Sequence, residues 1–355
     1  MPDTPVEALI HLVQDTEEKL KFSNKHHAHD GESLSDALAR FSSARLIPLL
    51  TQEKNSMQSP YILALVGLTN VGKSTLTEAL LGFPVAPQKS GPATAIPVEY
   101  VYGNNWEMEI LFRNFHTEVI PFIDAKALGA ELTKRVVDIN SKMVSTVAWV
   151  TVKGPMKMLK SGLTLADTPG FGATQIGDDD GAHQKRLEEF ICDRVHRVYF
   201  CVAAGEEWTI SDIEKDFYKR LSHICSHVIV NKWTGTSTEA EEYEHKYSSI
   251  FPFAKFIFVN ALKAIKGQNE NSSELFELSN LQAFHDIIEA YSTPGKRVNM
   301  CIPEIIRAWD NFHIYLKRKF NCRHIPWAEV SKQNFINSCS GNAVFDKITK
   351  NILGA

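Results

Sequence analysis

The chain has 355 residues, of which 44% are hydrophobic and 23% charged, and its formal net charge is −4. This composition is typical of a globular protein with one large or two ordinary domains, and the small net charge argues against a general attraction to nucleic acid or anionic membrane. The six cysteines form no C-x-x-C pair, which argues against a zinc site or a disulfide framework and predicts a cytoplasmic protein. No stretch approaches the roughly 18 apolar residues of a membrane span, so any membrane contact is expected to be peripheral.

Residues 1–57 are predicted to form an N-terminal helical segment. Apolar residues recur at approximately helical spacing over residues 4–22 and again over residues 34–50. A polar break that contains three histidines separates the two patterns, and we interpret it as a linker.

The next stretch matches the phosphate-binding motif G-x-x-x-x-G-K-[ST] at every fixed position. It follows the apolar run Tyr61 to Val66 and opens a helix-like segment that includes Thr75. Such a loop points backbone N–H groups at phosphates, its lysine neutralises their charge, and its serine offers a hydroxyl to Mg²⁺. The predicted phosphate-binding residues are Gly67, Thr69, Asn70, Val71, Gly72, Lys73, Ser74 and Thr75.

From residue 58 to 293 apolar strands alternate with helical patterns, which predicts an α/β domain with a mostly parallel sheet and helices on both faces. A long insertion spans about residues 104–160, with strand-like stretches at 107–112 and 146–153 and a helical stretch at 125–139. The predicted main strands are 61–66, 98–103, 162–166, 197–203, 226–230 and 255–259. Residues 294–355 are predicted to form a C-terminal helical segment.

Two loops within this domain are candidates for sensing the terminal phosphate. Asp167-Thr-Pro-Gly170 follows an apolar strand, so Asp167 is placed to hold Mg²⁺ through water and Gly170 to contact a γ-phosphate. Upstream, Thr94 lies in a Gly/Pro-containing loop before the second strand, where its hydroxyl is predicted to reach Mg²⁺.

Two later strands run into Asn231-Lys-Trp-Thr234 and Asn260-Ala-Leu262. With these, the five motifs in order resemble a P-loop GTPase, in which N-K-x-D reads guanine and S-A-[KL] backs the base. The resemblance implies base contacts from Asn231, Lys232, Thr234, Asn260 and Ala261. Thr234 replaces the family aspartate, and a neutral hydroxyl accepts the two guanine N–H bonds less well.

Within that class the chain resembles the dynamin-like GTPases over roughly residues 60–292. The resemblance rests on Gly91-Pro-Ala-Thr-Ala-Ile-Pro97, on the insertion before Asp167, and on Val198 to Ala203 followed by Trp208 to Asp212. The phosphate loop is closer to the Era-like and tRNA-modification GTPases, in some of which the residue equivalent to Asn70 helps to bind a monovalent cation.

The residue after Gly170 is Phe171, where Ras-like enzymes carry a water-orienting glutamine. The resemblance therefore implies a GTPase that hydrolyses GTP to GDP and phosphate as a conformational switch, needs Mg²⁺, and is assisted by K⁺ at Asn70 and by homodimerisation of the GTPase domain. Lys73, Asn70, Thr94 and Gly170 are the predicted catalytic residues.

Two other functions are compatible with the same motifs: a regulatory GTPase of tRNA or ribosome metabolism, and a nucleotide-binding interaction module with incidental hydrolysis. The basic stretch Lys317-Arg-Lys319 near Phe320 could contact acidic lipid or RNA. The alternative for this stretch is a solvated helix end.

Overall fold

The computed structural model describes residues 60–87, 96–136, 146–171, 182–204, 210–221, 224–251, 254–293 and 297. All of these except Thr293 and Arg297 belong to one compact unit, Ser59–Ser292. The predicted helical segments 1–57 and 294–355 lie, apart from residue 297, outside the described residues, as do Thr94 and residues 137–139 of the predicted insertion helix.

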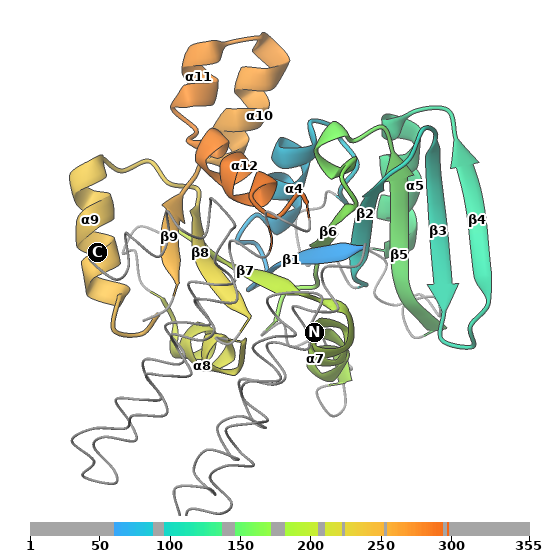
Figure 1. The fold of residues 1–355 in the computed structure, drawn as a ribbon, viewed down its shortest axis with the longest axis horizontal. Helices are drawn as coiled ribbons and strands as arrows, with labels where there is room; N and C mark the ends of the chain where they lie inside the picture. Colours follow the sequence, from blue (N-terminus) through green and yellow to red (C-terminus); the bar gives the residue numbers. More distant parts are fainter. Residues whose placement is uncertain are drawn as a thin grey trace, which may run out of the picture. The chain divides into compact units, whose positions relative to one another are not determined.

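A nine-stranded mixed sheet forms the centre of this unit, with the order β4-β3-β5-β2-β6-β1-β7-β8-β9 (Figure 1). Most neighbouring strands are parallel, whereas β2–β6, β3–β4 and β3–β5 are antiparallel. The strands are β1 (Tyr61–Gly67), β2 (Val98–Tyr102), β3 (Trp106–Phe112), β4 (Thr117–Phe122), β5 (Val147–Gly154), β6 (Leu163–Asp167), β7 (Arg197–Ala203), β8 (Cys225–Asn231) and β9 (Lys255–Phe258). The predicted α/β fold with a mostly parallel sheet is confirmed.

The central strands are apolar runs because both faces of the sheet are covered. Every residue of β1, β6 and β8 is buried, as expected for parallel strands between two helical layers. The six main strands predicted from the sequence all occur, and each end lies within one residue of the prediction.

Helices α4 (Lys73–Leu81), α10 (Ala261–Glu270), α11 (Ser273–Glu277) and α12 (Leu281–Glu289) lie on one side of the sheet, and α7 (Ala182–Arg194) and α8 (Asp212–Leu221) lie on the other (Figure 1). Side chains of α7, α8 and α9 (Ser237–Tyr247) pack with β1 and β7 in one hydrophobic cluster. On the opposite face, Phe284 of α12 meets Tyr199 of β7 edge-on at 5.1 Å.

The insertion extends the sheet instead of forming a separate body. Its strands β3 and β5 confirm the two predicted strand-like stretches, β5 pairs in parallel with β2, and helix α5 (Ala125–Val136) confirms the described part of the predicted helix. Strand β4 was not predicted. It carries Pro121 and is half exposed, features that obscure a strand pattern but are compatible with the edge of a sheet. A 3₁₀ turn at Lys157–Leu159 leads into β6.

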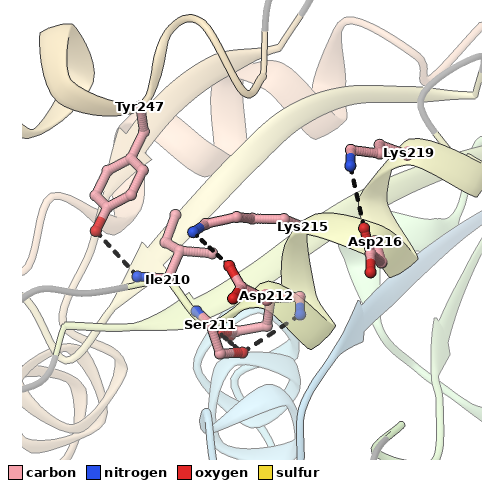
Figure 2. A network of polar contacts seen from close by, with 8 residues as sticks. Ile210, Ser211, Asp212, Lys215, Asp216, Lys219 and Tyr247 are labelled. Carbon is pink, nitrogen blue, oxygen red and sulfur yellow. Dashed lines mark hydrogen bonds and ion pairs between the residues drawn. The ribbon is translucent and has the colours of Figure 1, made fainter.

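After β7, the described part of the chain resumes at Ile210, and a hydrogen bond holds this residue in place. The Ile210 amide donates to the Tyr247 hydroxyl of α9 at 3.0 Å, and Ser211 caps α8 by accepting from the Glu214 amide at 3.3 Å. Figure 2 shows this arrangement together with two ion pairs along α8, Lys215–Asp212 at 2.8 Å and Lys219–Asp216 at 3.1 Å. The start of α8 is thereby tied to the end of α9.

Candidate nucleotide site

The predicted phosphate loop connects the end of β1 to the start of α4. Both of its motif glycines are required by close approach: a Cβ on Gly67 would lie 2.2 Å from the Cys201 carbonyl oxygen, and one on Gly72 would lie 2.5 Å from the Asn231 amide nitrogen. Gly72 also has a φ of 88°, a conformation that favours glycine. The loop is therefore packed against the ends of β7 and β8.

Lys73 folds back over this loop. Its ammonium donates to the carbonyl oxygens of Gly67 at 3.0 Å and Leu68 at 2.9 Å, and its side chain is buried. Burial lowers the pKa of Lys73, while the nearby charge of Asp167 opposes that shift. The positive charge is thus held at the mouth of the loop, where phosphates are expected to bind.

Ser74 and Asp167 meet although they are far apart in the sequence. The Ser74 hydroxyl donates to Asp167 Oδ2 at 2.6 Å, whereas Asp167 Oδ1 is buried and has no hydrogen-bond partner among the described residues. Burial raises the pKa of Asp167 from 3.8 to about 6, against the lowering effects of Lys73 and Ser74. A hydroxyl beside a carboxylate with an unpaired oxygen fits a hard cation such as Mg²⁺.

Gly170 lies directly against the phosphate loop. A Cβ at this position would lie 2.4 Å from the Thr69 hydroxyl oxygen and 2.6 Å from the Thr69 amide nitrogen. The Thr69 hydroxyl is itself buried without a hydrogen-bond partner in the described part of the chain. The predicted γ-phosphate contact at Gly170 therefore lies beside the loop, as the motif requires.

Phe171 belongs to the core and does not face the loop. Its amide donates to the Gly67 carbonyl at 3.3 Å, and its ring stacks on Phe217 with the centroids 4.0 Å apart. Because it is buried and has no polar side-chain atom, it cannot orient water.

Asn231 joins the base-binding motifs to the phosphate loop. Its amide group donates to the carbonyl oxygens of Val71 at 3.0 Å and Gly72 at 3.3 Å, and its Oδ1 accepts from the amides of Lys232 at 2.8 Å and Ala261 at 3.1 Å. The sequence motif indicated Asn231 as a base contact but gave no sign of this bridging role.

Lys232 reaches the same loop from the other side. Its ammonium donates to the Asn70 carbonyl at 2.7 Å, and both residues have positive φ, 61° for Lys232 and 66° for Asn70. Asn260 caps α10 and donates to the Trp233 carbonyl at 3.0 Å. The segments that carry the two predicted base motifs are therefore in contact, and their role in base recognition stays a prediction.

Within the described part of the chain, the structure assigns no role to Thr234 or Thr75, and Thr234 is exposed. The carboxylate nearest in sequence to Thr234 is Glu239, which accepts from the Thr236 amide at 2.7 Å in the capping box of α9. Glu239 is consequently occupied and does not replace the missing aspartate. Among the described residues, no group of three or more His, Cys, Asp or Glu side chains could hold a metal ion.

The chain is similar in sequence to a protein family and to two bacterial proteins. Residues 63–229 match the sequence model of the Dynamin family. A bacterial dynamin-like protein of Nostoc punctiforme is 22% identical over 240 residues, which are 65% of this chain and 34% of that protein. A protein of Caldicellulosiruptor sp., described as an uncharacterized protein in the xynA 3' region, is 23% identical over 254 residues, 67% of this chain and 57% of that protein.

A solved structure gives the same fold. It belongs to an oligomerised bacterial dynamin pair described as a mechanism for the long-range sensing and tethering of membranes, and it aligns with a TM-score of 0.50 at 15% identity over 97% of this chain and 63% of that chain. The chain thus spans less than two thirds of the length of each of these three proteins. In the described residues, no helix is long and apolar enough to cross a membrane.

Proposed function

We propose that this protein binds GTP and hydrolyses it to GDP and phosphate as a dynamin-like conformational switch, because residues 63–229 match the sequence model of the Dynamin family. The observation that supports this best is the contact between the Ser74 hydroxyl and Asp167 at 2.6 Å. It joins the phosphate loop to the end of β6 at a pair of oxygen groups suited to Mg²⁺.

In this proposal the chain's own groups stabilise the charge that develops on the transferring phosphoryl group. Lys73 leaves the carbonyls of Gly67 and Leu68 and pairs with the phosphates, together with the loop amides. Ser74, Asp167 and Thr94 would hold Mg²⁺, and Gly170 would report the γ-phosphate. When bound, Mg²⁺ neutralises charge on the phosphate oxygens.

The group that orients the attacking water must come from another position, because Phe171, which replaces the glutamine of Ras-like enzymes, is buried in the core. We assign that help to K⁺ near Asn70, which is exposed at the loop, and to a second GTPase domain facing the first. Turnover should rise in potassium salts relative to sodium and lithium salts and should rise with protein concentration. Turnover that is indifferent to both would contradict this part of the proposal.

Base selectivity is the part of the site where this chain departs from its family. We expect GTP to bind in preference to ATP through Asn231, Lys232, Asn260 and Ala261, but with weaker discrimination than an aspartate at position 234 gives. Titration of GTP, ATP and XTP in the presence of Mg²⁺ tests this, and Thr234→Asp should increase the preference for GTP. Tighter binding of ATP than of GTP would overturn the guanine assignment.

We also propose that the protein acts at a membrane surface from the cytoplasmic side, because the solved relative that shares its fold is described as sensing and tethering membranes. Sedimentation with vesicles of phosphatidylglycerol and phosphatidylethanolamine, with and without GTP, tests this. Recovery of the protein in the vesicle pellet supports it, whereas a soluble protein that carries RNA through purification would favour RNA metabolism instead.

A further inference from the structure

A groove that is separate from the phosphate loop lies beside α7. It encloses about 490 Å³, a volume within the range of sites that hold drug-sized ligands. Its walls come from the segment before β2, from β3 and its following turn, from β5, and from α7. The apolar lining includes Leu111, Phe112, Val147, Trp149, Leu187 and Phe190.

Phe115 stands at the rim of this groove, in the turn between β3 and β4, and its position is unfavourable in two respects. Its side chain is 88% exposed, and its backbone has a φ of 64°, a conformation that glycine or asparagine adopts far more readily than a bulky residue. The turn is closed by the Phe115 amide, which donates to the Phe112 carbonyl at 2.9 Å. A large apolar side chain held in such a conformation points to a contact outside the folded domain.

The charges around the groove are complementary. Arg113 lines it next to Phe115, whereas Glu189 and Asp193 line it from α7, four residues apart and therefore on one face of that helix. All three side chains are exposed, and none forms an ion pair within the part of the chain that the structure describes. The turn that carries Phe115 is thus basic. Across the groove, α7 presents these two carboxylates together with Arg194, whose charge is paired with Glu99.

We propose that a second copy of this chain docks here, with Phe115 of each copy entering the groove of the other and Arg113 facing Glu189 and Asp193. A two-fold axis makes such a surface self-complementary, because each copy contributes both the Phe115 turn and the groove that receives it. The charge of Arg113 is opposite to that of Glu189 and Asp193, and the apolar Phe115 suits the apolar lining of the groove, which favours a second copy over an unrelated partner. This surface includes Pro169 of the loop 167–170 but no residue of the phosphate loop 67–75, and the proposed association does not require GTP hydrolysis.

Sedimentation equilibrium of the full chain without nucleotide, over a range of protein concentrations, tests the proposal. We expect a reversible dimer that Phe115→Asn weakens by about tenfold or more, while the melting temperature is unchanged or higher because asparagine relieves the backbone strain. Ile123→Asn is the matched control, since Ile123 is a similarly exposed apolar residue (90%) just beyond β4, outside the groove. It should leave association unchanged.

Charge reversal across the interface gives an independent readout. Arg113→Glu alone and the double variant Glu189→Arg with Asp193→Arg should each weaken self-association, whereas an equimolar mixture of the two proteins should form a mixed dimer, because position 113 of each copy then faces charges of opposite sign in the other. A wild-type chain that stays monomeric, a dimer insensitive to Phe115→Asn, or a mixture that associates no better than its components would each overturn the proposal. So would an equal loss of association in Ile123→Asn.

Discussion

At the scale of single residues, two buried polar side chains organise the phosphate end of the domain. Asp167 meets Ser74 from the end of β6, and Asn231 binds the phosphate loop from the end of β8. Both are almost completely buried, so each interaction is made in a medium where an unsatisfied partner is costly. The site is therefore built as much from strand ends as from the loop itself.

The carboxylate of Asp167 should destabilise the protein at neutral pH when Mg²⁺ is absent. Because burial raises its pKa from 3.8 to about 6, the folded state binds a proton more readily than the unfolded state does. The stability gained by protonation is fully present below about pH 4 and is lost as the pH rises through 6. The charged group thus costs about 3 kcal/mol at pH 7.5.

Asp167→Asn should accordingly raise the free energy of unfolding at pH 7.5 in EDTA, by up to about 3 kcal/mol, with a difference that shrinks as the pH falls to 4. Urea unfolding at several pH values measures this. Glu241→Gln removes an exposed carboxylate outside the groove and should change stability by less than about 0.5 kcal/mol. A gain for Asp167→Asn that does not depend on pH would contradict the explanation.

Asn231→Ala should lower both stability and nucleotide affinity. The substitution leaves the amides of Lys232 and Ala261 and the Val71 carbonyl without their present partner, and we expect a loss of about 2–4 kcal/mol in the free energy of unfolding. Denaturant unfolding and GTP titration check the two effects separately. Unchanged stability would show that the bridge between the two loops contributes little.

At the scale of elements, the sequence predicted the strands with two-sided burial and the edge strand β9, but it missed β4 at the other edge of the sheet. Continuous apolar runs in β1, β6, β7 and β8 follow from burial between helical layers, whereas β4 alternates between exposed and half-buried residues and contains Pro121. Prediction of the candidate site has a similar limit. The local motif indicates Lys73 and Ser74. The contacts of Asn231 and Lys232 with the phosphate loop cannot be predicted in this way, because they depend on which strands are neighbours in the sheet.

An ion pair between half-buried Arg194 and buried Glu99 joins α7 to β2. Arg194 binds Glu99 through two hydrogen bonds of 2.8 and 3.1 Å, and its guanidinium lies 3.9 Å from the centroid of the Trp149 ring. The Glu99 side chain is only 5% exposed. The helix after the Asp167 loop is therefore held to the strand that follows the Thr94 loop.

Arg194→Ala should destabilise the protein by about 3–5 kcal/mol, since it leaves the buried Glu99 carboxylate without a partner. Thermal and urea unfolding measure this, and Lys266→Ala, in an exposed pair with Glu270, is the control with an expected effect of about 0.5 kcal/mol or less. Replacing both partners, Arg194→Met with Glu99→Leu, should recover most of the loss. A double variant as unstable as Arg194→Ala would contradict this reason.

At the scale of the whole molecule, the domain resembles a dynamin-family GTPase in both sequence and fold, and its candidate nucleotide site is assembled from segments of one compact unit, Ser59–Ser292. The composition and motifs were sufficient to predict this architecture, whereas the role of the phosphate-loop residues stays a prediction. They could not predict the groove beside α7, because its walls come from strands and a helix that only the folded sheet brings together.

The most direct test of the proposed function is multiple-turnover GTP hydrolysis by the full chain, compared with Lys73→Ala and with Lys255→Ala, which removes an exposed lysine at the start of β9. We predict steady release of phosphate from GTP by the wild type and by Lys255→Ala, and a loss of about 100-fold or more in Lys73→Ala. Phosphate release by Lys73→Ala at the wild-type rate, or none by the wild type, would contradict the proposal that this domain is a GTPase that acts through its phosphate loop.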